Sequence, residues 1–366
     1  MIGKISTRQL MLIMIVSRVS SILVLIPVVQ IGDARQDAWI ASILSTLTSC
    51  LVASLPAVLA MKFPGSSFGH VAKGVLGPYI GAVATGLVAL SLYIQALIRT
   101  RSMSLIVISQ FLPETPGWAL AVPLLAVALY GAVLGPDTIG RTAELMVTYL
   151  VGIIALGAIL LYGSKTSPVT GLKPILARGW GPVLAASVSP TFLGAVNASS
   201  VLALGRFTTK TSGILKAVVG ATLISGLILL VIVVQVLITI GPQQAQQALT
   251  PVLAMASTIY VEGIVERADL LVLASWVLGL TFDVTVLLMS ASIIIGDALS
   301  KSWRTVAVVL FLVGVVPASL RFTDTFSMRE LRTIPVTGIW TLVVFIGTIG
   351  LVLVAALIRG KRGAKS

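Results

Sequence analysis

Apolar runs of about twenty residues recur along nearly the whole chain, and short polar segments separate them. A run of about 18 or more apolar residues with few charges is long enough to cross the bilayer core as a helix. The runs are continuous and do not alternate with polar positions, which predicts helices rather than the strands of a barrel. We therefore predict ten transmembrane helices, at about residues 8–30, 38–62, 79–101, 117–135, 140–162, 182–205, 213–241, 268–297, 303–320 and 336–358.

The ten spans divide into two sets of five, at about residues 8–162 and 175–358, within one all-α polytopic domain over residues 1–366. The apolar part of the first span is too long for the core of a signal peptide, so we expect this span to be retained. Composition agrees with a membrane protein, since 57% of the residues are hydrophobic and 10% are charged. A typical soluble domain has about 25% charged residues.

Charge predicts the orientation of the spans. With a cytoplasmic N-terminus, the inner segments carry more Lys and Arg than the outer ones, and most acidic residues fall outside. The positive-inside rule then places both termini in the cytoplasm. The net charge of +13 is dispersed over loops on both faces, so we expect contact with lipid headgroups and no binding of nucleic acid.

The residues that usually carry metal or covalent chemistry are scarce. Cys50 is the single cysteine and His70 the single histidine, so the sequence predicts neither a disulfide nor a metal site. It also lacks HExxH, a P-loop and GxSxG. We predict that the protein is not an enzyme and needs no cofactor.

Polar residues inside a span are costly in lipid and therefore mark candidate functional positions. The centre of the first span carries Ser17, Arg18, Ser20 and Ser21, and Pro27 follows. This combination predicts a break in the helix at mid-membrane. The alternative is a continuous helix whose serines bond back to their own backbone carbonyls.

The sixth span has a similar polar centre. Pro190 lacks a backbone donor and disturbs the preceding turn, and Ser189, Thr191 and Asn197 lie around it. We predict a second break here, with a ligand site beside it. The alternative is a proline kink packed through small residues.

Breaks in the first and sixth helices would occupy corresponding positions of two five-helix halves. This arrangement is typical of LeuT-like transporters, which are built as a 5+5 inverted repeat. The N-termini of half-helices present backbone donors to an anionic group near the midplane. An amino-acid carboxylate suits such a site.

The third and eighth spans add polar candidates, Tyr93 in one and Thr281 and Asp283 in the other. Arg99 falls near the predicted outer end of the third span, where it is free to snorkel. Asp283 is the acidic residue that we place deepest in the membrane. It is a candidate proton or cation site, or else a counter-ion to Arg18, since a buried pair keeps both groups charged at lower cost.

The segment 242–267 is too long for a tight turn, and its apolar residues lie among polar ones in the pattern of an amphipathic helix. We predict a helix on the outer surface that covers the pocket or meets a partner. The alternative is a helix lying in the headgroup region.

Six segments, taken in order, carry a family resemblance: ISTRQL before the first helix, FPGSSF followed by LGPYIG after the second, FLPETPGW before the fourth, GPDTIGRTAEL before the fifth, LKPILARGWGPVLAA before the sixth, and VERADLLVLASWVLG opening the eighth. In this order they resemble the spore germination permease family, the GerAB-type B subunits of germinant receptors. The similarity extends over essentially the whole chain.

The resemblance implies a ten-helix member of the amino acid, polyamine and organocation superfamily, in the inner membrane of a spore-forming bacterium. It also implies a small nutrient ligand, often an amino acid, and two partners, an A-type membrane subunit and a C-type lipoprotein subunit. In proteins of this fold the ligand rests against helices one and six, with helices three and eight beside it. The corresponding positions here are Ser17, Ser20, Ser21, Tyr93, Ser189, Thr191, Asn197 and Thr281.

The sequence departs from transporter relatives at the first helix, where VSRVSS contains no glycine. Either Arg18 contacts a ligand carboxylate directly, or this position has diverged and the pocket differs. Two function classes remain open. One is a germinant sensor, in which ligand binding shifts a conformational equilibrium that partner subunits detect. The other is an amino-acid transporter, a proton- or cation-coupled permease.

Overall fold

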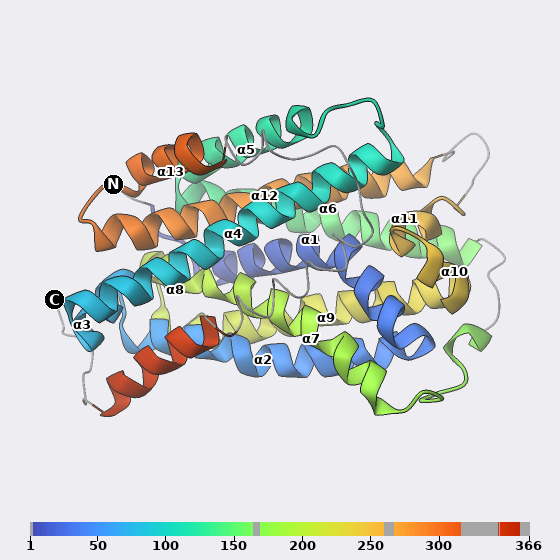
Figure 1. Ribbon diagram of the computed structural model, residues 1–366, viewed down its shortest axis with the longest axis horizontal. Coiled ribbons are helices and arrows are strands. Elements are labelled where there is room, and N and C mark those ends of the chain that lie inside the picture. Colours follow the sequence, from blue (N-terminus) through green and yellow to red (C-terminus); the bar gives the residue numbers. More distant parts are fainter. Residues whose placement is uncertain (1–2, 164–168, 260–266, 316–342, 344, 359–366) are drawn as a thin grey trace.

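The computed structural model describes residues 3–163, 169–259, 267–315, 343 and 345–358. It forms a bundle of helices that run mostly along the long axis of the molecule (Figure 1). The long helices are α1 (Thr7–Ala34), α2 (Ala38–Lys62), α4 (Pro78–Gln110), α5 (Gly117–Leu134), α6 (Pro136–Gly163), α7 (Trp180–Ser199), α9 (Ile214–Thr239) and α12 (Ala268–Ala298). The shorter ones are α3 (Phe68–Leu76), α8 (Val201–Leu204), α10 (Gly241–Gln247), α11 (Pro251–Ala256), α13 (Trp303–Leu310) and Phe345–Ile358.

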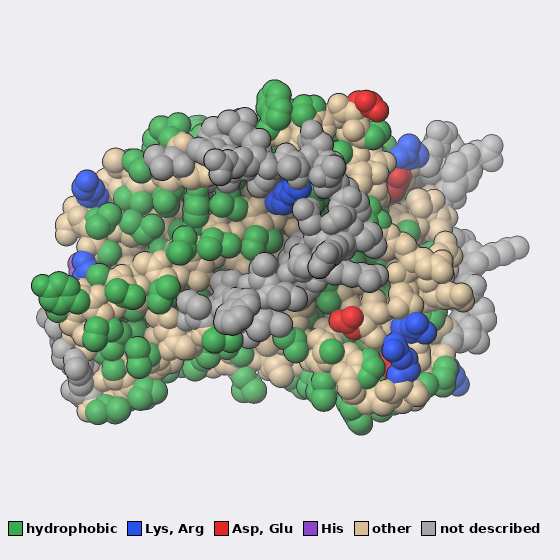
Figure 2. Space-filling model, viewed as in Figure 1, with side chains coloured by type: hydrophobic (Ala, Val, Ile, Leu, Met, Phe, Trp, Pro, Cys, Tyr) green, Lys and Arg blue, Asp and Glu red, His purple; other side chains and the backbone are tan. Residues whose placement is uncertain are grey.

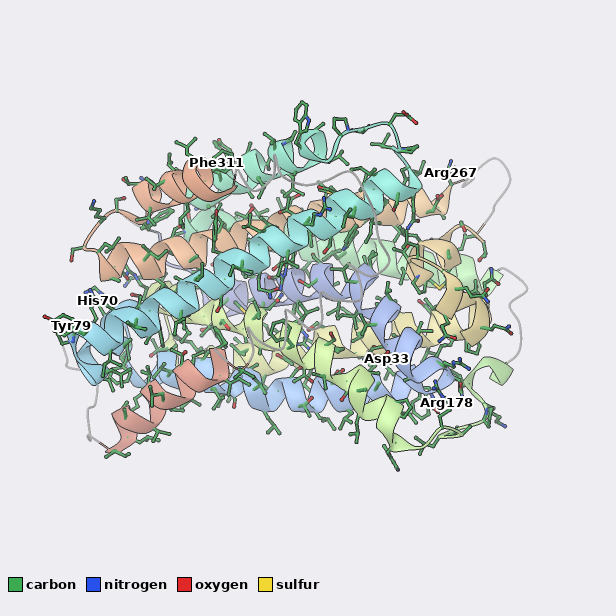
Figure 3. All side chains as sticks on the ribbon, viewed as in Figure 1. Asp33, His70, Tyr79, Arg178, Arg267 and Phe311 are labelled. Carbon is green, nitrogen blue, oxygen red and sulfur yellow. The ribbon has the colours of Figure 1, made fainter. Side chains whose placement is uncertain are left out.

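Among the described residues, six helical segments are long and apolar enough to cross a membrane, and the first of them, Thr7–Lys62, contains both α1 and α2. Hydrophobic side chains cover much of the face shown in Figure 2, while most of the charged ones lie toward its two ends. His70 lies near one end of the bundle, and Arg178 and Arg267 lie near the other (Figure 3). Leu47 and Leu51 of α2 and Leu227 of α9 are exposed on the outside of the bundle, as lipid-facing residues are. The protein is a multi-pass membrane protein.

Helix α1 lies at the centre of the bundle (Figure 1), in contact with α2, α6, α7, α9 and α12. Every residue from Leu12 to Pro27 is buried, as expected for a helix that is apolar on all sides. Its start is defined by a capping box, in which the Ser6 hydroxyl accepts from the Gln9 N–H at 3.1 Å and the Gln9 side chain accepts from the Ser6 N–H at 2.9 Å.

The predicted break in the first helix is wrong, because α1 is continuous through residues 17–21. The Ser20 hydroxyl donates to the Val16 carbonyl oxygen at 2.7 Å, and the Ser21 hydroxyl lies 2.9 Å from the Ser17 carbonyl oxygen, as in the back-bonded alternative. The helix does change direction along its length (Figure 1). It contains one proline, Pro27, and a proline interior to a helix is a common cause of a kink.

The sixth predicted span is interrupted, but later than expected. Pro190 lies inside α7, which continues to Ser199, and the interruption falls at Ser200 before α8 begins at Val201. The ninth span begins with α13, and a single turn of π-helix, Phe311–Val315, follows it. The rest of that predicted span, and the start of the tenth, lie outside the described residues.

Small residues bring the helices of the core close together, as in other membrane bundles. Gly279 of α12 faces the Ser20 side chain of α1, and a methyl group at this position would overlap the serine hydroxyl. Gly226 of α9 faces Thr46 of α2 in the same way. Gly279 therefore allows α12 to approach α1 closely, and Gly226 allows α9 to approach α2 closely.

The end of the bundle that carries the N-terminus is held by polar contacts. Ile5 makes two backbone hydrogen bonds to the segment after α8, donating to Phe207 O at 2.9 Å and accepting from Thr209 N at 3.0 Å. Arg206 forms an ion pair with Asp297 at the end of α12. The first contacts join the end of the sixth span to the start of the chain, and the ion pair joins it to the end of the eighth span.

The opposite end is covered by α10 and α11, two short helices where we predicted a single one within 242–267; residues 260–266 of that segment lie outside the described part. Val252, Leu253 and Met255 are buried, and α11 contacts α1, α9 and α12. The Gln110 side chain of α4 donates to Thr250 Oγ1 at 2.8 Å. The segment is therefore packed on the bundle as a cover over this end.

Candidate functional site

The polar centre of the bundle is built around Asp283, whose side chain is fully buried in α12. The Ser17 hydroxyl of α1 donates to Asp283 Oδ1, and the Ser21 hydroxyl lies 2.7 Å from Oδ2. The single Ser21 hydroxyl proton goes either to this carboxylate or to the Ser17 carbonyl oxygen of its own helix. Arg99 of α4 forms an ion pair with the same carboxylate. A charge in the membrane interior requires such partners, because an uncompensated one is costly.

Asn197 of α7 completes this centre. Its side-chain oxygen accepts from Arg99 Nη2 at 2.7 Å, and its nitrogen donates to the Ser17 hydroxyl at 3.2 Å. Because an arginine only donates, the amide oxygen of Asn197 has to face Arg99. The network of Ser17, Ser21, Arg99, Asn197 and Asp283 joins α1, α4, α7 and α12, and we call it the polar network.

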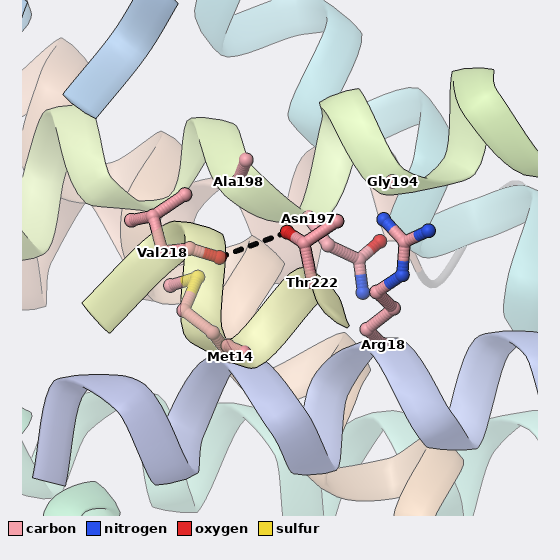
Figure 4. A pocket seen from close by; sticks show the side chains of 8 residues that line it. Met14, Arg18, Gly194, Asn197, Ala198, Val218 and Thr222 are labelled. Carbon is pink, nitrogen blue, oxygen red and sulfur yellow. Dashed lines mark hydrogen bonds between the residues drawn. The ribbon is translucent and has the colours of Figure 1, made fainter. Parts of the chain in front are cut away.

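The predicted pair between Arg18 and Asp283 is wrong, since Asp283 is paired with Arg99. Helix geometry gives the reason. Ser17 and Ser21 are four residues apart and share one face of α1, whereas Arg18 is rotated by about 100° from Ser17. The serines face Asp283, and Arg18 points toward Gly194 of α7 instead (Figure 4).

Arg18 is the unusual residue of the site. Its side chain is 3% exposed, and none of its three guanidinium nitrogens has a hydrogen-bond partner in the part of the chain that the structure describes. Gly194 makes room for the guanidinium, because any side chain at that position would overlap it. A buried cation is thus held beside α7 without a counter-ion among the described residues.

A small cavity adjoins Arg18 where α1, α7 and α9 meet (Figure 4). The space that a water-sized sphere can occupy is about 10 Å³, close to what one water molecule needs. Its walls are mostly apolar, with polar groups from three residues. It is lined by Met14, Arg18, Gly194, Asn197, Ala198, Val218, Ala221 and Thr222.

The remaining predicted ligand residues do not join this centre through a hydrogen bond between described side chains. The Tyr93 hydroxyl donates to Leu310 O at 3.0 Å, and Thr281 bonds back to Val277 O of its own helix. The Thr191 hydroxyl lies 2.6 Å from that of Thr48 in α2. Ser20 and Ser189 are buried on α1 and α7.

Sequence reasoning missed two residues of the site. Arg99 was placed near the end of its span, but α4 continues to Gln110, so the guanidinium lies inside the bundle. The signal was present in the run IRTRSMSLIVI, which stays largely apolar beyond the arginines. Trp276 is fully buried in α12, and its indole N–H donates to Ser20 O of α1 at 3.0 Å.

Solved structures with the same arrangement of helices include a transporter. The structure of MhsT in complex with L-phenylalanine matches with a TM-score of 0.69 at 15% identity, over 99% of this chain and 91% of that one. Mhp1, a nucleobase-cation-symport-1 family transporter, matches with a TM-score of 0.69 at 13% identity, over 98% and 79%. The predicted LeuT-like fold is confirmed.

Comparison of sequences identifies the family to which this LeuT-like protein belongs. Residues 4–327 match the spore permease family, described as spore germination protein, and the chain belongs to this family. It is 25% identical to spore germination protein YndE of Bacillus subtilis (strain 168), over 82% of each chain. It is also 27% identical to spore germination protein KB of the same organism, over 78% of this chain and 76% of that one.

Proposed function

We propose that this protein is the membrane-embedded B-type subunit of a germinant receptor, and that it binds a small nutrient, an amino acid, to signal spore germination. Membership of the spore permease family supports a role in spore germination. The observation that carries the binding site is Arg18, a buried guanidinium without a partner among the described residues. A ligand carboxylate supplies two acceptors, which matches the paired donors of a guanidinium.

The proposed ligand site extends from Arg18 to Asn197 and to the face of α1 that carries Ser17 and Ser21. Asn197 lines the cavity beside Arg18 and is also bonded to Ser17 in the polar network. The cavity is too small for an amino acid, so α7 or α9 has to move for the ligand to enter. A site that exists only after such a movement couples ligand binding to conformation, which is what a sensor requires.

The alternative function is a proton- or cation-coupled amino-acid permease, in which Asp283 would bind the coupling ion. In the structure this carboxylate already has Arg99, Ser17 and Ser21 as partners. A coupling ion would have to displace the Arg99 guanidinium. This arrangement favours the sensor over the coupled transporter.

The proposal includes the setting of the protein. We place it in the inner membrane of a spore-forming bacterium with both termini in the cytoplasm, together with an A-type membrane subunit and a C-type lipoprotein subunit. The cover formed by α10 and α11 is then on the outer face, where it closes the ligand path or meets a partner. The contact of Thr250 with Gln110 is one of the bonds that opening would break.

Two measurements on the purified protein test this function. Calorimetry against a panel of amino acids should find at least one that binds, and flux of that amino acid in proteoliposomes should be absent with or without the partner subunits. Flux by the protein alone would support the permease, and a panel without any binder would contradict the proposed ligand class.

Asn197→Leu should weaken amino-acid binding by about 1–3 kcal/mol, because it removes a buried hydrogen-bonding group next to Arg18. Thr191→Leu should have a smaller effect, since the Thr191 hydroxyl already bonds to Thr48 and to Ser187 O. Calorimetry gives both affinities, and the helical content of each variant, from circular dichroism, serves as the control for folding. Equal affinities for wild type and Asn197→Leu would remove this residue from the site.

A further inference from the structure

The described charges at the middle of the bundle do not balance. Arg99 is paired with Asp283, while Arg18 has no hydrogen-bond partner among the described residues. Two other buried carboxylates are engaged elsewhere: Asp37 accepts from Leu176 N at 2.9 Å, and Asp269 is paired with Arg267. One positive charge is therefore left over, where an isolated ion is very costly.

We propose that a small inorganic anion of the size of chloride binds to Arg18 when the nutrient is absent. The cavity beside Arg18 has room for about one water-sized particle, and a monatomic halide is only slightly larger than water. Met14, Val218 and Ala221 form apolar walls, which exclude a bulky, hydrated anion. The guanidinium supplies hydrogen-bond donors that no described group accepts.

Gly194 determines where the guanidinium lies. It lies against the Arg18 guanidinium, and a side chain there would displace it. Gly194 and Arg18 both line the cavity, so the guanidinium lies next to the space that we assign to the anion (Figure 4). The site thus consists of a fixed cation, a space of ionic size and walls that admit little else.

A second consequence rests on the proposed function. If the carboxylate of the nutrient also binds Arg18, the two anions compete, and the nutrient has to displace the halide. The apparent affinity for the amino acid then falls as the chloride concentration rises. Chloride would act as a stabiliser of the ligand-free conformation.

Thermal unfolding of the detergent-purified protein in sodium chloride or sodium gluconate, at equal ionic strength, tests the anion site. The unfolding midpoint of the wild type should rise with the logarithm of the chloride concentration, since chloride binds the folded state only. Gluconate is too large for the cavity and should have no such effect. Arg18→Gln should lose at least about tenfold in chloride affinity, whereas Arg18→Lys keeps the charge and should retain part of the dependence.

Arg206→Gln is the matched control, because it removes a partly buried arginine from the far end of the sixth span and should leave the chloride dependence intact. Binding of radioactive chloride to the wild-type protein gives a readout that needs no variant. An absence of saturable chloride binding would overturn the proposal, as would an undiminished dependence in Arg18→Gln. Chloride that binds at Arg18 but is not displaced by a bound amino acid would confirm the anion site and place the nutrient carboxylate elsewhere.

Discussion

Asp283→Leu and Arg99→Met should each lower the free energy of unfolding by about 3–5 kcal/mol, which is the usual cost of removing one partner from a buried ion pair. The two side chains are 0% and 1% exposed, so water cannot compensate the charge that is left behind. Asp283→Leu also strands the hydroxyls of Ser17 and Ser21. Equilibrium unfolding in mixed detergent micelles measures each loss.

The double variant Arg99→Met, Asp283→Leu should be less damaged than the sum of the two single variants, by at least about 1 kcal/mol. Removing both charges leaves no isolated ion, and two apolar side chains of similar volume fill the space. Arg206 and Asp297 form the comparison pair, with side chains 21% and 17% exposed. Their coupling should be weaker, because partial solvent access screens the interaction.

Additive losses at Arg99 and Asp283 would contradict the pairing that the structure shows. The same cycle with Arg18 in place of Arg99 provides the internal control, since Arg18 is not a partner of Asp283. Its coupling energy with Asp283 should be smaller than that of Arg99. This comparison separates the pair of Arg18 with Asp283, which the sequence left open, from the pair of Arg99 with Asp283 that the structure contains.

The positions of the spans were predictable because they depend on local composition. The predicted helix at 38–62 coincides with α2, and the prediction for 268–297 ends one residue before α12 does. Hydropathy over about twenty residues is a sum of many contributions, so single errors have little effect. The predicted span at 79–101 is too short, because it ends just beyond Arg99, whereas α4 continues to Gln110.

Four members of the polar network, Ser17, Ser21, Asn197 and Asp283, are among the residues that the sequence predicts as polar positions inside the spans, and the structure brings them together in the interior of the bundle. Their partners were not predictable, because pairing depends on how each helix is rotated about its axis. A rotation of about 100° separates Ser17 from Arg18, and this difference directs one to α12 and the other to α7. The charges can be read from the sequence, but which of them form ion pairs depends on how the helices pack.

The continuous α1 illustrates a further limit of sequence reasoning. Ser20 and Ser21 were interpreted as residues that stabilise a break, but the same hydroxyls bond to carbonyls of an intact helix. Both uses need the same residue types at the same positions. The burial of α1 on all sides favours the intact helix, because an open backbone group there would have no water as a partner.

Trp276→Ala should lower the free energy of unfolding by about 3–5 kcal/mol, because it removes a large, fully buried side chain and leaves a cavity between α12 and α1. Gly279 follows Trp276 by three residues, and Asp283 follows Gly279 by four, so the three residues form one stripe on α12. This stripe faces α1, through the Trp276 bond to Ser20 O, the contact of Gly279 with Ser20, and the bonds of Asp283 to the serines. We call this contact between α12 and α1 the seam. It keeps Ser17 and Ser21 of α1 next to Asp283.

Trp276→Phe separates the two contributions of this residue. It keeps most of the packing and loses the hydrogen bond to Ser20 O, so we expect a cost of about 1 kcal/mol. Trp118→Ala is the matched control, because that tryptophan is 50% exposed on α5 and its removal should change stability by less than about 0.5 kcal/mol. If Trp276→Ala costs no more than Trp118→Ala, the seam between α1 and α12 does not hold the polar network, and its stability has to come from α4 and α7 alone.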